Sequence, residues 1–264
     1  MPEVKLIAID LDDTLLRTDL TISTRAKTAI FSAAKKGISV TLATGRMFAT
    51  AIPFANDLKL NLPLITYQGA LVKYADGRLV YHKPLSQQIA RELVSFILPY
   101  GYHLNVYMND ELYMDKDSPE GRRYVATSKV PVHLEKNLVD NISIDPSKLL
   151  VIADEQRLDA LAFDIKYTFG DSVNITKSSR YFLEIGHPEA TKGLALKGLA
   201  DSLGIGADEV MAIGDSWNDL DMLAYAGFSV AMENAVPDIK KIAKYVTRKN
   251  DDDGVAEAIE RWAL

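Results

Sequence analysis

Two aspartates near the start of the chain, Asp10 and Asp12, have the spacing of a chemically active pair. They are two positions apart, so in an extended chain their side chains point to the same side. Neighbouring carboxylates repel each other, and one is driven toward its protonated form unless a cation neutralises the pair. Such a pair can bind Mg²⁺, supply a nucleophile that attacks phosphorus, and give or take a proton.

Three further segments carry groups that suit a phosphate ester. Thr44-Gly45-Arg46 offers a hydroxyl and a closely approachable backbone N–H ahead of a predicted helix, and Lys192 offers a compact positive charge. A second acidic cluster is Gly214-Asp215-Ser216-Trp217-Asn218-Asp219. Each segment alone is also typical of a turn, a helix cap or a surface lysine. The four together, in this order, indicate phosphate chemistry.

The elements that must position these residues alternate between strand and helix patterns. The first part of the chain predicts strands at 4–10, 38–43 and 64–66 and helices at 24–36 and 48–58; the last part predicts strands at 210–213 and 228–231 and helices at 191–203, 219–226, 236–243 and 255–262. This order indicates a parallel sheet flanked by helices. Ligands of such sheets bind at the carboxyl ends of the strands, where the three polar clusters lie.

The middle of the chain has a different pattern. Short strands at 104–108 and 112–114 flank Asn109-Asp110, which is typical of a hairpin, and further helices and strands follow. We therefore expect residues 84–187 to form an inserted α+β domain. Residues 1–83 and 188–264 would then form one core domain of ordinary size.

Composition narrows the classes of function. The chain has 264 residues, of which 48% are hydrophobic and 25% charged, and its formal net charge is −6. An acidic chain is a poor candidate for tracking a nucleic-acid backbone. The absence of cysteine leaves oxygen and imidazole as metal ligands. With no apolar run of about 20 residues and no leader pattern, we expect a cytoplasmic protein without a membrane span.

These motifs resemble those of the haloacid dehalogenase superfamily, specifically its Cof-type class IIB phosphatases. The family pattern is D-x-D-x-T, a Thr or Ser after the second strand, a Lys, and G-D-x-x-N-D. Here these are Asp10 to Thr14, Thr44-Gly45-Arg46, Lys192-Gly193 and Gly214 to Asp219. The resemblance covers essentially the whole chain. It implies a Rossmann-like parallel-sheet core with an inserted α+β cap of the C2 type.

The resemblance also implies roles for individual residues. Asp10 resembles the nucleophile and a Mg²⁺ ligand, and Asp12 resembles the general acid and base, with its backbone carbonyl also on the metal. Asp215 resembles the third protein ligand of Mg²⁺. The implied phosphate cradle consists of the Leu11 backbone N–H, Thr44, Gly45, Lys192 and Asn218. Asp219 resembles a residue that supports this cradle from behind.

Two positions depart from the family pattern. Asp13 stands where the family commonly has Gly, and Gln68 stands where it often has Asn. From strand alternation we expect the side chain of Asp13 to point away from Asp10 and Asp12. The resemblance implies that Gln68 lies in a loop that orients the substrate.

The implied function is Mg²⁺-dependent hydrolysis of small phosphomonoesters, such as sugar phosphates or related metabolites, through an aspartyl-phosphate. A phosphotransferase or phosphomutase with the same motifs is an alternative, because only the phosphoryl acceptor differs. A non-enzymatic receiver-type switch is a second alternative. Receivers carry their phosphoacceptor Asp at the end of the third strand, whereas residues 64–67 contain none. The sequence does not indicate an oligomeric state.

Overall fold

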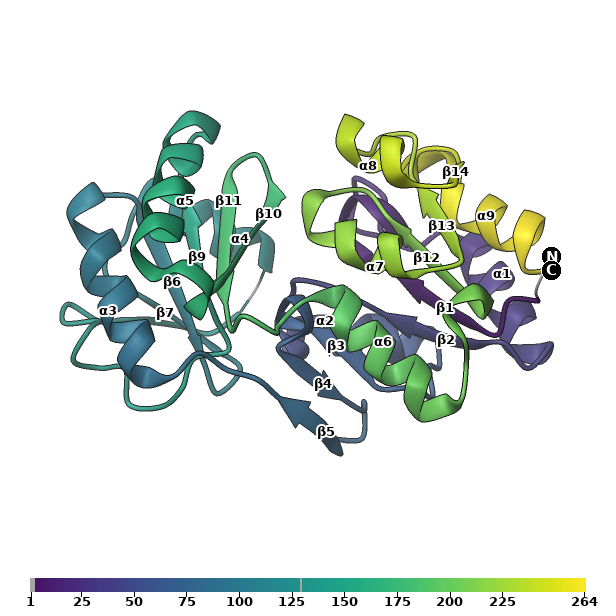
Figure 1. The fold of residues 1–264 in the computed structure, drawn as a ribbon, viewed down its shortest axis with the longest axis horizontal. Coiled ribbons are helices and arrows are strands. Elements are labelled where there is room, and N and C mark those ends of the chain that lie inside the picture. Colours follow the sequence, from purple (N-terminus) through teal and green to yellow (C-terminus); the bar gives the residue numbers. More distant parts are fainter. Residues whose placement is uncertain (1–2, 129) are drawn as a thin grey trace.

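A five-stranded parallel sheet forms one half of the molecule (Figure 1). The computed structural model describes residues 3–128 and 130–264. The strand order is β14-β13-β12-β1-β2, with bounds Tyr245–Val246, Phe228–Ala231, Val210–Gly214, Leu6–Ile9 and Ser39–Leu42. Strand β1 is buried along its whole length and pairs with β12 on one side and β2 on the other. The predicted α/β class with a parallel sheet is confirmed.

Helices cover this sheet in two sets. The bounds are α1 Thr24–Lys35, α2 Phe48–Asp57, α6 Lys192–Leu203, α7 Leu220–Tyr225, α8 Pro237–Ile242 and α9 Gly254–Trp262. Helix α1 packs against α9, and α6 packs against α7. From β1 to β2 the chain moves toward one edge of the sheet, and from β12 to β13 it moves toward the opposite edge. Because such crossovers are right-handed, α1 and α7 lie on opposite faces, and β1 and β12 flank the point where the direction reverses.

The predicted third strand starts a small sheet of its own. β3 (Leu64–Thr66) meets the parallel sheet through one bridge between Ala43 and Ile65, and it pairs with β4 (Leu71–Lys73) in antiparallel fashion. β5 (Leu79–His82) completes this sheet. The connection between β3 and β4 is a tight turn in which Tyr67 and Gln68 have φ of 51° and 59°.

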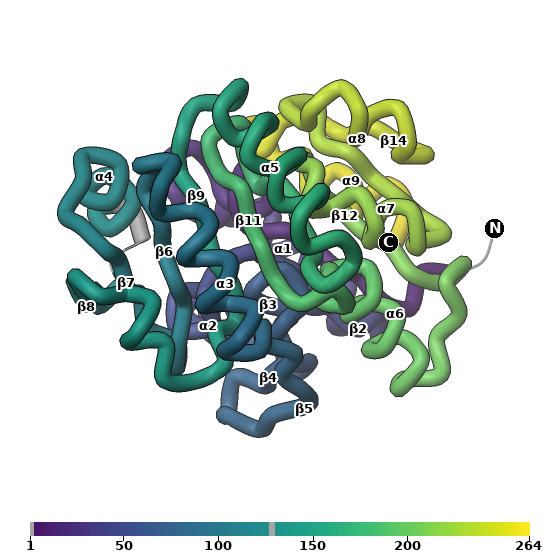
Figure 2. The backbone as a smooth tube through the Cα atoms, turned by 60° about the vertical axis from the view of Figure 1, so that its left-hand side comes forward, coloured from purple at the N-terminus to yellow at the C-terminus, as the bar shows by residue number. Residues whose placement is uncertain are grey.

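The inserted segment forms the other half of the molecule around a six-stranded mixed sheet (Figures 1 and 2). The order is β10-β11-β9-β6-β7-β8, with bounds Asn174–Ser179, Phe182–Gly186, Lys148–Ile152, His103–Met108, Glu111–Met114 and Val132–Leu134. Its helices are α3 Gln87–Ile97, α4 Pro119–Ser128 and α5 Glu155–Phe169. Helices α3 and α5 cover one face of the sheet in both views.

Alternation along these strands separates two environments. One set of side chains, including Leu104, Val106, Leu149 and Val151, packs in a hydrophobic cluster whose buried members all lie between residues 85 and 185. The other set faces the parallel-sheet half, and its apolar members join the main cluster of that half.

Among the described residues, no helix is long and apolar enough to span a bilayer.

The approach of Gly69 to the first turn of α6 generates a prediction. Gly69 has φ of +96°, and a Cβ there would lie 2.2 Å from the Thr191 carbonyl oxygen. Gly77 has nearly the same φ, +95°, with open space around it. Gly77→Ala should therefore cost only the backbone strain of about 1–2 kcal/mol. Gly69→Ala should cost a further ~1–3 kcal/mol because the backbone of α6 must shift.

Denaturant unfolding of the two variants measures this difference. Equal losses of unfolding free energy in the two variants would show that the contact between Gly69 and Thr191 is not tight in solution.

Candidate active site

The carboxyl ends of three adjacent strands bring the predicted residues together. Asp10 follows β1, Thr44 follows β2 after one residue, and Asp215 follows β12. Since β1 lies between β12 and β2, their ends meet at one edge of the sheet. The site therefore sits at the point where the strand order reverses, as expected for an open parallel sheet.

A buried lysine lies between two of the aspartates. The Lys192 Nζ is 2.6 Å from Asp10 Oδ1 and 2.6 Å from Asp219 Oδ1, and its side chain has no exposed surface. Lys192 is the first residue of α6, which Thr191 caps through its side chain. The N-terminus of α6 thus fixes this ammonium group directly beside Asp10.

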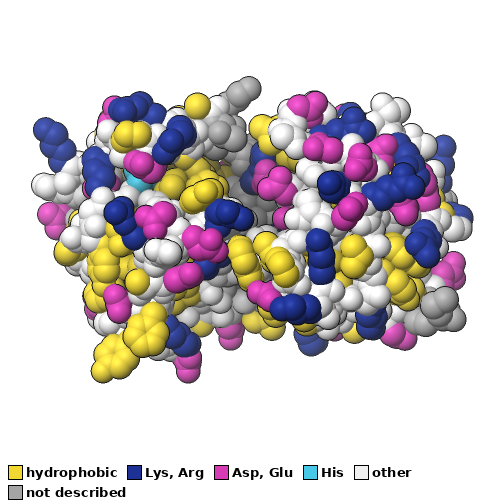
Figure 3. Space-filling model, turned by 90° about the horizontal axis from the view of Figure 1, so that it is seen from above, with side chains coloured by type: hydrophobic (Ala, Val, Ile, Leu, Met, Phe, Trp, Pro, Cys, Tyr) yellow, Lys and Arg dark blue, Asp and Glu magenta, His cyan; other side chains and the backbone are white. Residues whose placement is uncertain are grey.

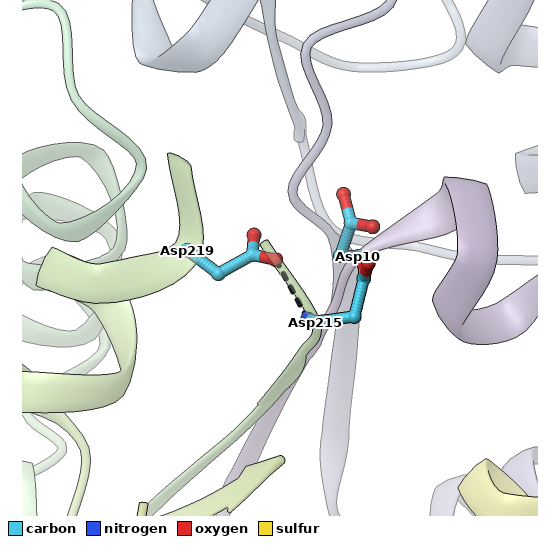
Figure 4. A group of neighbouring side chains, drawn as sticks. All are labelled: Asp10, Asp215 and Asp219. Atoms are coloured by element: carbon cyan, nitrogen blue, oxygen red, sulfur yellow. Dashed lines mark hydrogen bonds between the residues drawn. The ribbon is translucent and has the colours of Figure 1, made fainter. Parts of the chain in front are cut away.

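Asp219 holds the neighbouring loop as well as the lysine. Its Oδ2 accepts hydrogen bonds from the backbone N–H groups of Asp215, at 2.9 Å, and Ser216, at 3.1 Å. The Thr14 hydroxyl donates to Asp215 Oδ1 at 2.9 Å. Figure 4 shows Asp10, Asp215 and Asp219 converging, with the bond from Asp215 to Asp219 dashed. Both oxygens of Asp219 are thus occupied by protein donors.

The carboxylates of this cluster repel one another in a buried setting. Burial raises the pKa of Asp10 to about 8; Lys192 opposes this rise, whereas Asp219 and Asp12 add to it. Burial also raises the pKa of Asp215, and Asp219 and Asp10 raise it further. A carboxylate oxygen from each of Asp10, Asp215 and Asp219 lies within 4.8 Å of the others. An oxygen-rich group with too little positive charge fits a divalent cation.

Asp12 lies beside this cluster and is oriented by Arg46. The Arg46 Nε donates to Asp12 Oδ2 at 2.8 Å, and its Nη2 donates to Asp12 Oδ1 at 2.5 Å. This is the planar, two-bond arrangement that guanidinium and carboxylate groups favour. The carboxylate of Asp12 is half-exposed, so it is open to the cavity while its orientation is fixed.

The segment after β2 packs against Gln68 and Asn218. A Cβ at Gly45 would lie 2.3 Å from Gln68 Nε2, so a larger residue here would displace the Gln68 side chain. The Asn218 Nδ2 donates to Gln68 Oε1 at 3.1 Å. The buried atoms Gln68 Nε2 and Asn218 Oδ1 have no hydrogen-bond partner within the described protein. A donor and an acceptor left over beside the cluster are consistent with contacts to a bound ligand.

A cavity of about 850 Å³ lies over the carboxyl ends of β1, β2 and β12. Asp10, Asp12, Thr44, Gly45, Asp215 and Asn218 line it from the parallel-sheet half. The mixed sheet forms the opposite wall with alternate residues of β9 and β11, including Lys148, Leu150, Phe182 and Glu184. Figure 3 shows the surface hollowed between the two halves, with hydrophobic side chains on its left wall and acidic ones on its right.

The predicted site residues thus come together, with three of them set back from the cavity. Lys192 and Asp219 are fully buried next to Asp10 and do not line the cavity. The Leu11 side chain is buried in the core, which leaves its backbone for the predicted contact. The sequence motifs indicated no separate role for Arg46 or Thr14. Both residues lie within the motifs, but their contacts depend on the loop conformations, which pair Arg46 with Asp12 and Thr14 with Asp215.

The expectation for Asp13 was wrong. Strand β1 ends at Ile9, and residues 11–15 form a tight turn in which Asp13 has φ of 55°. Strand alternation therefore does not apply, and Asp13 lines the same cavity as Asp10 and Asp12. Burial raises the pKa of Asp13, and Asp12 and Asp251 raise it further.

Known proteins share this chain's sequence and fold over nearly its full length. A family model described as haloacid dehalogenase-like hydrolase matches residues 7–259. A Bacillus subtilis protein named 5-amino-6-(5-phospho-D-ribitylamino)uracil phosphatase YwtE is 30% identical over 98% of each chain. A solved haloacid dehalogenase-like hydrolase from Bacteroides thetaiotaomicron is 30% identical, with a TM-score of 0.87 over 98% of this chain and 99% of that one.

A solved subclass IIB sugar phosphatase of this superfamily, 22% identical, has the same fold with a TM-score of 0.85 over 97% of this chain and 98% of that one. The family match covers the four motifs, and the matched relative spans the inserted segment as well. This protein is therefore an enzyme that belongs to the haloacid dehalogenase-like hydrolases.

Proposed function

We propose that the protein is a Mg²⁺-dependent phosphatase that hydrolyses small phosphomonoesters through an aspartyl-phosphate on Asp10. The observation that carries the proposal is the buried contact of Asp10 with Lys192 at the edge of the cavity. A carboxylate nucleophile, a fixed cation and a half-exposed second carboxylate are the groups that phosphoryl transfer requires. Asp10 and Asp12 follow the carboxyl end of β1, and Lys192 lies at the start of α6.

In the first step Asp10 attacks phosphorus, and the bond between phosphorus and the ester oxygen breaks. Asp12 gives its proton to the departing alcohol. In the second step Asp12 takes a proton from water, whose oxygen attacks phosphorus and displaces Asp10 as a free carboxylate. Arg46 orients Asp12 on the cavity wall through hydrogen bonds to both of its oxygens, which suits the second step, in which Asp12 accepts a proton.

Asp10 and Asp215 would hold the Mg²⁺ ion with their carboxylates, together with the backbone carbonyl of Asp12. Asp219 would support them, because its own oxygens are occupied by Lys192 and two backbone N–H groups. When bound, the ion supplies positive charge that neutralises carboxylate and phosphoryl oxygens. Leu11, Thr44, Gly45, Lys192 and Asn218 complete the proposed surroundings of the phosphate.

We further propose that residues 84–187 act as a cap domain on a core formed by 1–83 and 188–264. The cap wall of the cavity would determine which leaving alcohols fit and would exclude water in the first step.

Sugar phosphates or related phosphorylated metabolites are the proposed substrates. A relative is named for a phosphate ester of a ribityl-linked uracil, which supports testing polyol and nucleotide phosphates beside sugar phosphates. A cytoplasmic location stays a prediction.

A phosphate-release screen over sugar, polyol and nucleotide phosphates tests the function. We expect release from at least one ester class, with wild-type protein in Mg²⁺. A parallel reaction with added sugar acceptor separates hydrolysis from phosphoryl transfer: a phosphorylated acceptor in place of inorganic phosphate would contradict the hydrolase proposal.

Asp10→Asn should abolish turnover while leaving the fold intact. The amide has nearly the same shape but is a poor nucleophile and a weak metal ligand. Asp13→Asn is the matched control, since it makes the same change at a carboxylate lining the same cavity, and it should retain most turnover. Phosphate release is measured together with thermal unfolding. Sustained turnover by a sequence-verified Asp10→Asn protein would exclude the covalent mechanism.

Removal of divalent ions should silence the enzyme, and Mg²⁺ should restore it, because buried carboxylates repel each other and an anionic substrate. Ca²⁺ should substitute poorly, since it prefers a larger and looser set of ligands. Mg²⁺ should also raise the melting temperature of the wild type but not of Asp215→Asn. Full activity in excess chelator would mean that the acidic cluster needs no metal.

Asp12→Ala should slow catalysis in a way that depends on the leaving group. A sugar alkoxide needs a proton as it departs, so phosphoenzyme formation from a sugar phosphate should fall by about 10²–10⁴-fold. Nitrophenolate leaves without help, so the same step with nitrophenyl phosphate should change much less. Single-turnover measurements compare the two. An equal loss with both substrates would show that Asp12 is not the proton donor.

A further inference from the structure

One lysine of the inserted segment contacts the loop that follows β2, residues 43–47, which we call the phosphate loop after its proposed role. Lys148, the first residue of β9, donates from Nζ to the Gly45 carbonyl oxygen at 2.7 Å and to Glu184 Oε2 at 2.5 Å. The side chains of Lys148 and Glu184 are only 4% and 6% exposed. This contact therefore links the cap wall to the loop after β2 at a buried position.

The surroundings of Lys148 compensate its charge from several sides. Glu184 is held in turn by Ser178, whose hydroxyl donates to Oε1 at 2.8 Å. The Lys148 ammonium also lies 4.8 Å from the centre of the Tyr107 ring. A buried ammonium is costly unless each partner is in place. The Gly45 carbonyl belongs to this set only while the two halves sit together as they do here.

The peptide between Gly45 and Arg46 links the Lys148 contact to Thr44. Its carbonyl accepts from Lys148, and its N–H donates to Thr44 Oγ1 at 3.1 Å. A hydroxyl that accepts such a bond keeps its own proton available for another acceptor. Arg46, on the far side of the same peptide, orients Asp12 through two hydrogen bonds.

We propose that Lys148 is a positioning residue that fixes the peptide of Gly45 and Arg46. When the cap is seated, Lys148 sets the plane of this peptide, so that the Thr44 hydroxyl faces the phosphate and the Arg46 side chain holds Asp12. The role rests on the proposed phosphatase function, because it acts through the phosphate loop. It makes phosphate binding depend on a cap residue that need not contact the leaving alcohol.

The test compares binding of inorganic phosphate, which has no leaving group. Lys148→Met removes the ammonium but leaves Glu184 buried without its partner, so Lys148→Met/Glu184→Gln is made as well to preserve the fold. Lys166→Met is the matched control: its Nζ likewise donates to a backbone carbonyl, that of Gly170, and to a carboxylate, that of Asp171, but on the surface of the cap. Thermal unfolding checks all variants.

We expect both Lys148 variants to weaken inhibition by inorganic phosphate in Mg²⁺ by about 10-fold or more, the scale for a lost hydrogen bond to a charged group. Their kcat/KM should fall at least as far for every ester, whereas Lys166→Met should match the wild type. Unchanged phosphate inhibition in a stably folded double variant would overturn the proposal. A loss confined to KM for one ester would also overturn it, by showing that Lys148 reads the leaving alcohol.

A wild-type protein that released no phosphate from any ester would instead contradict the proposed function. Calorimetric titration of inorganic phosphate into the Mg²⁺-loaded variants would then still test Lys148. Equal affinities in wild type and double variant would reject its role, and a weaker affinity in the double variant would support it.

Discussion

The charge balance around Asp10 is the constraint on which the rest of the site depends. Three clustered carboxylates, two of them buried, share one ammonium, that of Lys192, which lies 2.6 Å from the two buried ones. Desolvation makes each uncompensated charge costly, so the ammonium must be held rigidly. The capped start of α6 and the close approach of Gly69 to Thr191 provide this rigidity. The remaining negative charge makes the cluster suited to a metal ion and an electrophilic phosphorus.

Bringing these groups to one point forces unusual backbone conformations beside them. Asp13, Tyr67 and Gln68 all have positive φ. The positions at which the family commonly has Gly and Asn are thus two of the left-handed positions of this chain. Aspartate tolerates such a conformation through its short polar side chain. Gln68 lacks that advantage, and its side chain is instead held by Asn218 and packed over Gly45.

Much of this arrangement could be predicted because it follows from the sheet. Parallel strands that end in Asp10, Thr44 and Asp215 must present them at one edge, and the alternating patterns located those strands. The direction of Asp13 could not be predicted, because it depends on a turn that replaces the expected strand. The pairing of Arg46 with Asp12 depends on two loops 34 residues apart in sequence. The reach of Lys148 depends on how two halves of the chain meet, which local patterns do not encode.

The contacts between the halves indicate that the inserted segment does more than form one wall of the cavity. Asp110, at the tip of the hairpin between β6 and β7, accepts hydrogen bonds from the Ala49 N–H in the first turn of α2 and from the Tyr67 hydroxyl. Lys148 contacts Gly45, in the same loop region. Asp110 therefore holds segments near the loop after β2 and Lys148 holds that loop itself, whereas Asp10, Lys192 and Asp219 are brought together by residues outside the inserted segment. With the proposed function, this division would let the core keep one chemistry while the inserted segment determines when the loop after β2 is in position.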